Sequence, residues 1–188
     1  MKRGLILVVI VGCALGVWKA TKQKSQGTPS FSTTEEFIAF ATQSALADAQ
    51  TYDHIKLDYS VDSLKQVDQI LGRVHDAYVK NPSSIHLRGV ATEYGAYVGE
   101  VIRRNQPDAY WTRDSEVAGE KSYPLHWKTG ESYPFHWCEE RILNGEEDSI
   151  WIKYSTLNGP DWEQHNSTNW KQRNPGVVVR STKVSPPK

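Results

Sequence analysis

An apolar stripe between residues 60 and 82 constrains the fold of this chain more than any other feature. Its apolar residues recur at intervals of three and four positions, the spacing of one face of an α-helix; they are Val61, Leu64, Val67, Ile70, Leu71, Val74 and Tyr78. Ser60 can cap this helix, and Asn81-Pro82 ends it. A stripe this wide must be buried, so the sequence predicts a core helix with His75 and Asp76 solvated beside it.

Two further helices are predicted, one before and one after this helix. Residues 33–50 begin with Thr33-x-x-Glu36, which has the spacing of a capping box. Residues 84–104 are rich in small side chains, and three of these fall on one face: Ala91, Gly95 and Gly99. Each glycine in a helix interior costs about 1 kcal/mol. We therefore expect this face to pack closely against the preceding helix or a sheet; a groove that admits a ligand is the alternative.

A six-residue phrase occurs twice with a single change. Ser122-Tyr123-Pro124-Leu125-His126-Trp127 returns as Ser132-Tyr133-Pro134-Phe135-His136-Trp137. With Thr129-Gly130 as a two-residue turn, the two copies predict a β-hairpin in which His126 faces Tyr133. Because side chains alternate along a strand, His126 and His136 fall on opposite faces and cannot share a metal ion unless a bulge intervenes.

One face of the predicted hairpin is expected to be a binding surface. It carries Tyr133, Phe135 and Trp137, which are aromatic types that recur in binding hot spots, and it also carries His126. An exposed patch of this kind indicates an interaction site. The predicted binding residues are these four and Trp111, which precedes the doubled phrase.

Catalysis is the less favoured hypothesis. Glu93 and Glu100 place two carboxylates two turns apart on one predicted helix, and paired carboxylates can perform acid–base chemistry in a cleft. His136 and Cys138 could form a nucleophilic pair. No motif supplies an orienting acid or an oxyanion hole. The sequence therefore predicts no catalytic residue, no metal site and no cofactor, and Cys138 is expected to be a buried, unreactive thiol.

Residues 1–24 are predicted to be a membrane anchor or a lipoprotein signal. Two basic residues precede an apolar run from Gly4 to Trp18, and three lysines follow it. As an uncleaved helix, these 15 residues span about 22 Å, short of the ~30 Å hydrocarbon core, and the flanking lysines reduce the deficit by snorkelling. As a signal, Ile10-Val11-Gly12-Cys13 resembles a lipobox and makes Cys13 the candidate lipidated residue. A buried N-terminal helix is the third interpretation.

Charge is distributed unevenly along a chain whose formal net charge is zero. The first 24 residues hold five basic residues and no acid, so the remainder holds 17 basic and 22 acidic residues, a net charge of −5. A mildly acidic remainder argues against nucleic acid as a partner, because neutralising phosphates requires a basic surface. The predicted partners are the membrane, through the N-terminal segment, and another protein. The two cysteines are Cys13 and Cys138, which excludes a disulfide scaffold.

The rest of the sequence predicts one α+β domain at residues 33–157. Residues 25–32 are polar with Gly and Pro, which is typical of a linker. A last helix is predicted from a cap at Asp148 to Leu157. Residues 158–188 lack apolar periodicity and are predicted to be a mostly disordered tail. The expected architecture has N-terminal helices packed on a small antiparallel sheet or hairpin, with a C-terminal helix.

Several short motifs resemble those of a group of small bacterial domains of unknown function. They are Leu57-Asp58-Tyr59-Ser60, Gly95-Ala96-Tyr97-Val98-Gly99-Glu100 and Asn144-Gly145-Glu146-Glu147-Asp148-Ser149. The resemblance covers about residues 57–157 and implies an α+β fold with a loose link to immunity-type proteins. It implies no established activity and no catalytic residues.

These features favour a non-catalytic protein-binding module of the immunity or adaptor type, tethered to a membrane with its domain outside the cytoplasm. Two alternatives stay open. An envelope hydrolase would require Glu93, Glu100, His136 and Cys138 to converge in one pocket. A structural envelope component would show neither a cleft nor an apolar patch.

Overall fold

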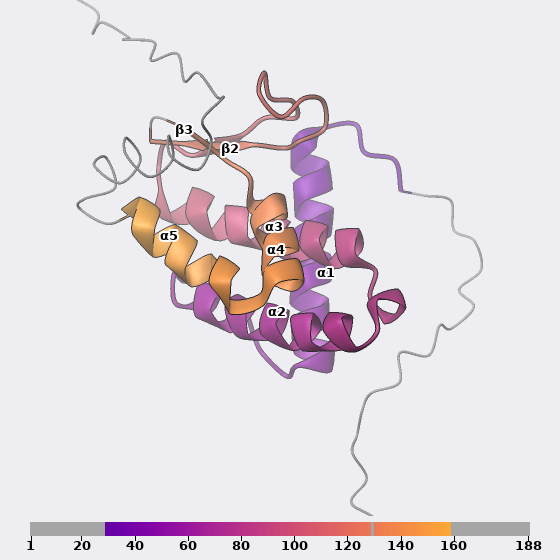
Figure 1. Cartoon of the computed structure of the whole chain (residues 1–188). Helices are drawn as coiled ribbons and strands as arrows, with labels where there is room; N and C mark the ends of the chain where they lie inside the picture. The colour runs from indigo at the N-terminus through magenta and orange to yellow at the C-terminus, as the bar shows by residue number, and fades with distance from the viewer. Residues whose placement is uncertain (1–28, 129, 159–188) are drawn as a thin grey trace, which may run out of the picture.

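The computed structural model describes residues 29–128 and 130–158, and Figure 1 shows how their elements are arranged. These residues form five α-helices and a three-stranded antiparallel sheet, which confirms the predicted α+β class with a C-terminal helix. The helices are α1 (Thr34–Tyr52), α2 (Ser63–Lys80), α3 (Leu87–Asn105), α4 (Pro134–Asn144) and α5 (Ile150–Asn158). The strands are β1 (Tyr110–Trp111), β2 (Leu125–Trp127) and β3 (Gly130–Ser132), and the short 3-10 turns are Pro82–Ser84 and Gly145–Asp148.

Three predicted features lie outside the described residues: the anchor or signal at residues 1–24, the lipidation candidate Cys13, and the tail after Asn158. Within the described ranges, no helix combines the length and the apolar character that a membrane span requires.

Helix α3 lies at the centre of the fold and packs against α1 on one side and α4 on another (Figure 1). Its small face makes the close contacts. A Cβ atom added to Gly95 would lie 2.6 Å from Phe135 Cα of α4, and one added to Gly99 would lie 2.0 Å from Trp111 Cζ2 of β1. The expected close packing is therefore confirmed for these two glycines. Their partners are α4 and β1 rather than the preceding helix α2.

The doubled phrase does not form the predicted hairpin. Its first copy contains β2, but its second copy leaves the sheet after Ser132 and continues as α4 from Pro134. Proline lacks the N–H that a strand ladder needs, whereas its fixed φ suits the first position of a helix. Phe135 and Trp137 therefore lie on a helix, and the predicted strand face that held them is wrong.

The predicted register is wrong by two residues. His126 pairs with Glu131 instead of Tyr133, so the turn is at residues 128–129, and Lys128 takes the positive φ of 55°. A shift of two residues preserves the side of each strand residue, so His126 and Glu131 still share a face. A third strand, β1, pairs with β2 on its other edge and places Tyr110 opposite His126.

The start of α5 is fixed by a carboxylate from α2. Asp68 Oδ1 accepts from Arg141 Nε at 2.8 Å and from the Ile150 backbone N–H at 3.1 Å, and Asp68 Oδ2 accepts from Ser149 Oγ at 2.5 Å. Ser149 Oγ in turn accepts from the Ile152 backbone N–H. The predicted cap at Asp148 is thus replaced by Ser149 and Asp68, because the tertiary structure brings α2 to the helix start.

His75 is not solvated as predicted. Its Nδ1 donates to the Ile142 carbonyl at 2.8 Å, and its ring lies under Gly145. Gly145 has a φ of 77°, and a Cβ there would lie 2.9 Å from His75 Nε2. The residue that ends α4 is therefore glycine for two reasons, its left-handed backbone and the histidine ring beside it.

Candidate binding groove

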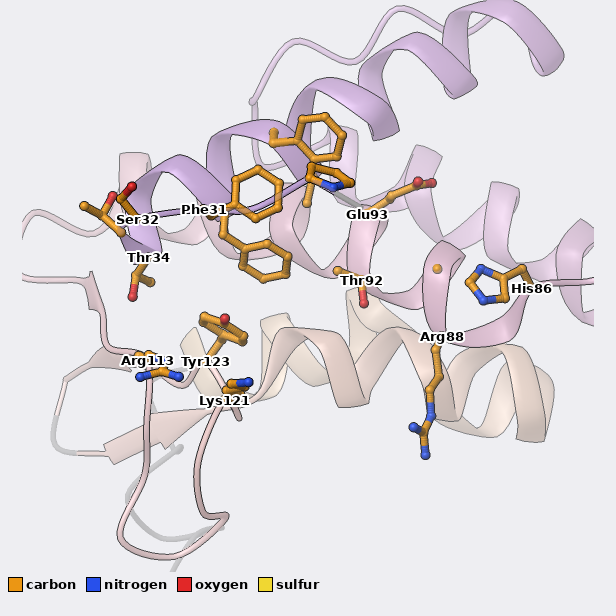
Figure 2. Close-up of a pocket in the computed structure, with 16 residues that line it drawn as sticks. Phe31, Ser32, Thr34, His86, Arg88, Thr92, Glu93, Arg113, Lys121 and Tyr123 are labelled. Atoms are coloured by element: carbon orange, nitrogen blue, oxygen red, sulfur yellow. The ribbon is translucent and has the colours of Figure 1, made fainter. Parts of the chain in front are cut away.

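An open groove lies between the N-terminal half of α1, the N-terminal half of α3 and the loop that connects β1 to β2 (Figure 2). Its volume is about 920 Å³. Aromatic side chains line it on the α1 side. The start of α3 and the loop contribute the charged side chains Arg88, Glu93, Arg113 and Lys121, together with His86. We call it the α1–α3 groove.

Five aromatic rings form a continuous chain along the groove and behind it. Phe31 packs on Phe40 with ring centroids 5.1 Å apart, and Phe40 is 51% exposed. Phe37 extends the chain to Tyr123 of the loop at 4.6 Å and to Phe135 of α4 at 6.0 Å. Aromatic pairs of this kind contribute ~0.5–1.5 kcal/mol beyond the burial of their area. The rings therefore fix the shape of the groove.

The β1–β2 loop forms a hydrogen-bonded wall of the groove. Tyr123 N donates to the Arg113 carbonyl at 3.0 Å, and Lys121 N donates to Asp114 Oδ1 at 2.7 Å. Lys121 and Tyr123 both have positive φ, 55° and 46°, in a region that costs a non-glycine residue roughly 1–2 kcal/mol. Both side chains line the groove. The hydrogen bonds of the wall therefore maintain a backbone conformation that these two residues would otherwise rarely adopt.

Three cations flank the aromatic rings. Figure 2 shows Arg113 and Lys121 at one end of the groove and Arg88 at the other. Among the described residues, Arg88 and Lys121 form no salt bridge, and the contact of Arg113 with Asp114 is long, at 3.9 Å. The surrounding domain is acidic: residues 29–158 hold 12 Lys and Arg against 20 Asp and Glu, a net charge of −8. Glu93 is the one carboxylate among the groove-lining residues, so with Arg88, Arg113 and Lys121 the groove carries a net positive charge on an acidic domain.

The five predicted binding residues lie in three environments, and none of them lines the groove. Phe135 and Trp111 lie behind it, with ring centroids 5.8 Å apart. Trp137 lies on α4 and packs against the main core. His126 and Tyr133 belong to a polar cluster on the sheet. Phe135 and Trp111 thus support the groove from behind, whereas Trp137, His126 and Tyr133 lie away from it.

The polar cluster on the sheet is occupied by internal hydrogen bonds. Ser115 Oγ donates to Glu131 Oε2 at 2.7 Å, lies 2.9 Å from Tyr133 OH, and accepts from two backbone N–H groups of its own turn. Tyr133 OH also donates to Glu131. His126 Nε2 lies 2.9 Å from Thr112 Oγ1. A hydroxyl with this many partners is not available to attack a substrate, so the cluster attaches the β1–β2 loop to the sheet.

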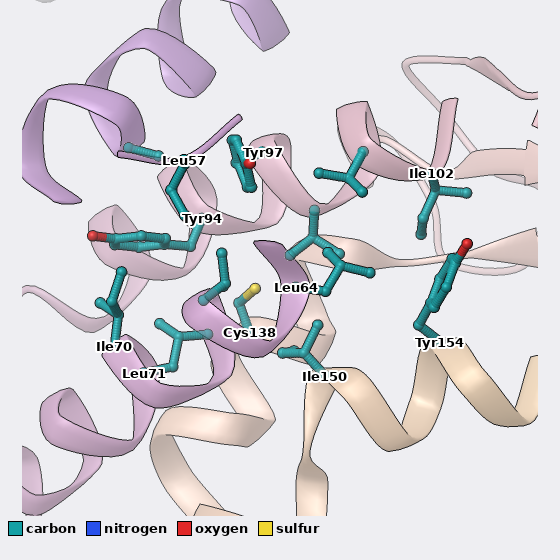
Figure 3. Close-up of a cluster of buried hydrophobic side chains, with 14 of the residues drawn as sticks. Leu57, Leu64, Ile70, Leu71, Tyr94, Tyr97, Ile102, Cys138, Ile150 and Tyr154 are labelled. Carbon is teal, nitrogen blue, oxygen red and sulfur yellow. The ribbon is translucent and has the colours of Figure 1, made fainter. Parts of the chain in front are cut away.

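The residues of the hydrolase hypothesis do not converge. Glu100 accepts from Arg103 at 2.7 Å and 2.9 Å. His136 is exposed on α4 and pairs with glutamates of its own helix. Cys138 is fully buried in the main hydrophobic cluster (Figure 3), and burial raises the pKa of its thiol, as expected for an unreactive cysteine. Of the four candidates, Glu93 alone lines the groove.

Glu93 shares a side-chain hydrogen bond with Asp48 of α1. Burial, reinforced by the negative charge of Asp48, raises the pKa of Glu93 from 4.5 to about 7. Between these two pH values the folded chain holds a proton on Glu93 that the unfolded chain has lost. The contribution of Glu93 to the free energy of unfolding therefore decreases as the pH rises through this interval.

Glu93→Gln is expected to raise the free energy of unfolding by about 1 to 2 kcal/mol at alkaline pH, because the amide carries no charge to desolvate. We keep this expected gain small because water reaches the half-buried carboxyl group and screens its charge. The substitution should also flatten the fall in stability between pH 4.5 and about 7. Urea denaturation at the two ends of this interval checks both effects; an unchanged pH dependence would contradict the assignment to Glu93.

Glu100→Gln is the matched control on the same helix. Burial alone would raise the pKa of Glu100, but hydrogen bonds from Arg103 and Trp111 and the charges of Arg103 and Arg104 outweigh it and lower this pKa. The Glu100 contribution is therefore present above the usual glutamate pKa and is lost as the pH falls. Glu100→Gln is expected to lower the stability at neutral pH, the opposite sign to Glu93→Gln.

The described residues contain no group of three or more His, Cys, Asp or Glu side chains that could hold a metal ion. Comparison of the chain with protein families, with curated proteins and with solved structures found no match. No ligand or activity is therefore carried over from a relative.

Four aromatic groove residues were not predicted from the sequence as binding residues: Phe31, Phe37, Phe40 and Tyr123. Phe31 belongs to the predicted linker at residues 25–32, yet its ring packs on Phe37 with centroids 5.5 Å apart. Phe37 and Phe40 belong to the helix predicted at residues 33–50, and neither is among the five predicted binding residues. A large exposed aromatic residue outside the apolar stripe of a helix, close to another in a linker, is the signal that would have indicated a surface.

Proposed function

We propose that this chain is a membrane-tethered, non-catalytic protein-binding module of the immunity or adaptor type, and that the α1–α3 groove receives a segment of its protein partner. The main support is the open groove of about 920 Å³, in which aromatic side chains stay accessible and Phe40 is 51% exposed. Aromatic rings and arginine are enriched in binding hot spots. A hydrolase has less support, because Glu93 lies in the groove without the other three candidates.

We propose residues 1–24 as the tether, with Cys13 lipidated or the segment retained as a helix, and the domain outside the cytoplasm. With a retained helix, Phe31 follows Lys24 by seven residues, which extend over at most about 25 Å, so the groove would lie close to the membrane surface. With a lipidated Cys13, 18 residues lead to Phe31 and extend over at most about 65 Å. Protease added to cells with a permeabilised outer membrane should digest the domain, and protection would contradict this location. A lipoprotein should incorporate labelled fatty acid and lose this label in Cys13→Ser, whereas a retained helix should incorporate none in either form.

Photo-crosslinking in cells tests the binding function. The crosslinking amino acid benzoylphenylalanine placed at Phe40 is expected to form an adduct with one defined protein, identified by mass spectrometry, because this position is an exposed part of the groove. The matched control is Ile152, which is 56% exposed on α5, on the other side of α4 from α1 in Figure 1.

Tyr123→Gly supplies the second arm of this experiment. It removes an aromatic ring from the groove and relieves the positive φ of 46°, so the domain should stay folded while the adduct at position 40 is lost. Equal adducts from positions 40 and 152, or an adduct that persists in folded Tyr123→Gly, would contradict partner binding in the groove.

A further inference from the structure

We propose, on the basis of the binding function above, that the segment received by the α1–α3 groove is acidic, with a large apolar side chain between its acidic residues. The charges of the groove carry this inference. Arg88 lies at one end and Arg113 and Lys121 lie at the other, while the ring of Phe31 lies on the α1 side (Figure 2). Phe40 belongs to α1 itself and also lines the groove. An elongated segment with acids at both ends and an apolar residue in the middle complements this order.

This complementarity requires that the three cations are not already neutralised by carboxylates of the domain. Arg88 and Lys121 are exposed and form no salt bridge with any described residue, and Arg113 contacts Asp114 at the long distance of 3.9 Å. Their positive charge is therefore not neutralised at short range. On a domain of net charge −8, such a site attracts acidic groups locally, whereas the rest of the surface repels them.

The chain's own outer segments have the wrong charge for this site. Residues 1–28 contain five basic residues and no acid, and residues 159–188 contain five basic residues and two acids. Like charges across an interface are unfavourable. Net charge therefore favours a separate protein as the occupant, and the one stretch of these segments with an acid on each side of an apolar residue is Asp161-Trp162-Glu163.

The separation of the cations also distinguishes a peptide from a lipid headgroup. A single phosphate is held by donors that converge on it. In the groove, Arg88 is separated from Arg113 and Lys121 by Thr92 and the aromatic side (Figure 2). Cations at two ends of an elongated groove suit carboxylates spaced along a peptide.

A substitution of Lys121 can distinguish a role in binding from a role in folding alone. Its φ of 55° is unfavourable for lysine and easy for glycine, so Lys121→Gly is expected to raise the urea midpoint of unfolding. The same substitution removes one cation from the groove and should weaken binding of an acidic segment. A residue retained for folding alone would not show a gain of stability together with a loss of binding.

The experiment uses the full chain in nanodiscs of uncharged lipid and a display library of random twelve-residue peptides. We expect the selected peptides to be enriched in Asp and Glu on both sides of an aromatic or branched aliphatic residue. In fluorescence anisotropy, the double substitution Arg88→Glu, Lys121→Glu should raise the dissociation constant of a selected peptide by about tenfold or more. Added salt should also raise it. The matched control Lys56→Glu, an exposed lysine outside the groove, should leave its affinity unchanged.

Each other outcome overturns the inference. Selection of basic or uncharged peptides whose binding is lost in Tyr123→Gly would leave the groove as a protein-binding site and reject the acidic class. Acidic peptides that bind equally to the Arg88→Glu, Lys121→Glu variant would place their site elsewhere. Failure to select any peptide, with anionic lipid in the nanodisc instead protecting Arg88 and Lys121 from chemical modification, would identify a membrane surface as the occupant. A selected peptide that matches Asp161-Trp162-Glu163 would identify the chain's own C-terminal segment as the occupant and reject a separate partner.

Discussion

Asp68→Ala is expected to lower the free energy of unfolding by about 3 to 5 kcal/mol at neutral pH. The exposed fractions of the Asp68 and Arg141 side chains are 16% and 10%, so the substitution leaves the Arg141 guanidinium nearly buried without its carboxylate. It also removes the acceptor for Ser149 Oγ and for the Ile150 backbone N–H. Urea denaturation followed by tryptophan fluorescence measures the loss.

Two further variants test whether the loss of stability comes from the buried Asp68–Arg141 pair. Asp62 lies just before α2, is 82% exposed and pairs with Lys65. Exposed pairs contribute ~0–1 kcal/mol, so Asp62→Ala should have a small effect on the free energy of unfolding. Asp68→Leu combined with Arg141→Met removes both buried charges and should recover a large part of the loss. A loss below about 1 kcal/mol for Asp68→Ala would show that the Asp68–Arg141 pair does not hold α5 in place.

Gly95→Ala is expected to destabilise the domain by about 2 to 3 kcal/mol, although alanine favours a helix over glycine by about 1 kcal/mol. The added Cβ would lie 2.6 Å and 2.8 Å from the backbone Cα and N of Phe135. A backbone cannot move aside as the end of a side chain can, so α4 must shift away from α3. Thermal or urea unfolding measures the effect.

Gly89→Ala is the control in the same helix and should have the opposite sign. The nearest atom to its added Cβ is His86 Nδ1 at 2.3 Å, and His86 is an exposed side chain that can rotate away. The helix propensity of alanine should then raise stability by up to about 1 kcal/mol. Equal effects of the two substitutions would mean that the contact between Gly95 and α4 does not determine the stability.

The Gly95 contact also links the fold to the groove. Phe135 packs on Gly95 and, from there, contacts Phe37 and Tyr123. A shift of α4 would therefore move the ring that supports the groove from behind. We expect Gly95→Ala to weaken partner binding as well as the fold.

Local patterns in the sequence predicted α1, α2, α3 and α5, whereas the first part of α4 was predicted to be a strand. The stripe from Val61 to Tyr78 falls within and just before α2, and Thr33 accepts from the Glu36 backbone N–H as the capping box predicted. The hairpin prediction failed because two similar phrases have different tertiary surroundings. The first copy pairs with β1, while the second packs through Phe135 on Gly95 of α3 and begins a helix at Pro134.

The sequence by itself determined the α+β class, the helices α1, α2 and α3 and the burial of Cys138, because these depend on periodicity and composition within single segments. The tertiary structure alone decided the strand register, the attachment of α5 by Asp68 and the α1–α3 groove. The groove combines Phe31, Arg88 and Lys121, which come from three distant segments. Pairing between segments this far apart depends on packing and charge across the whole domain, which no local spacing in the sequence records.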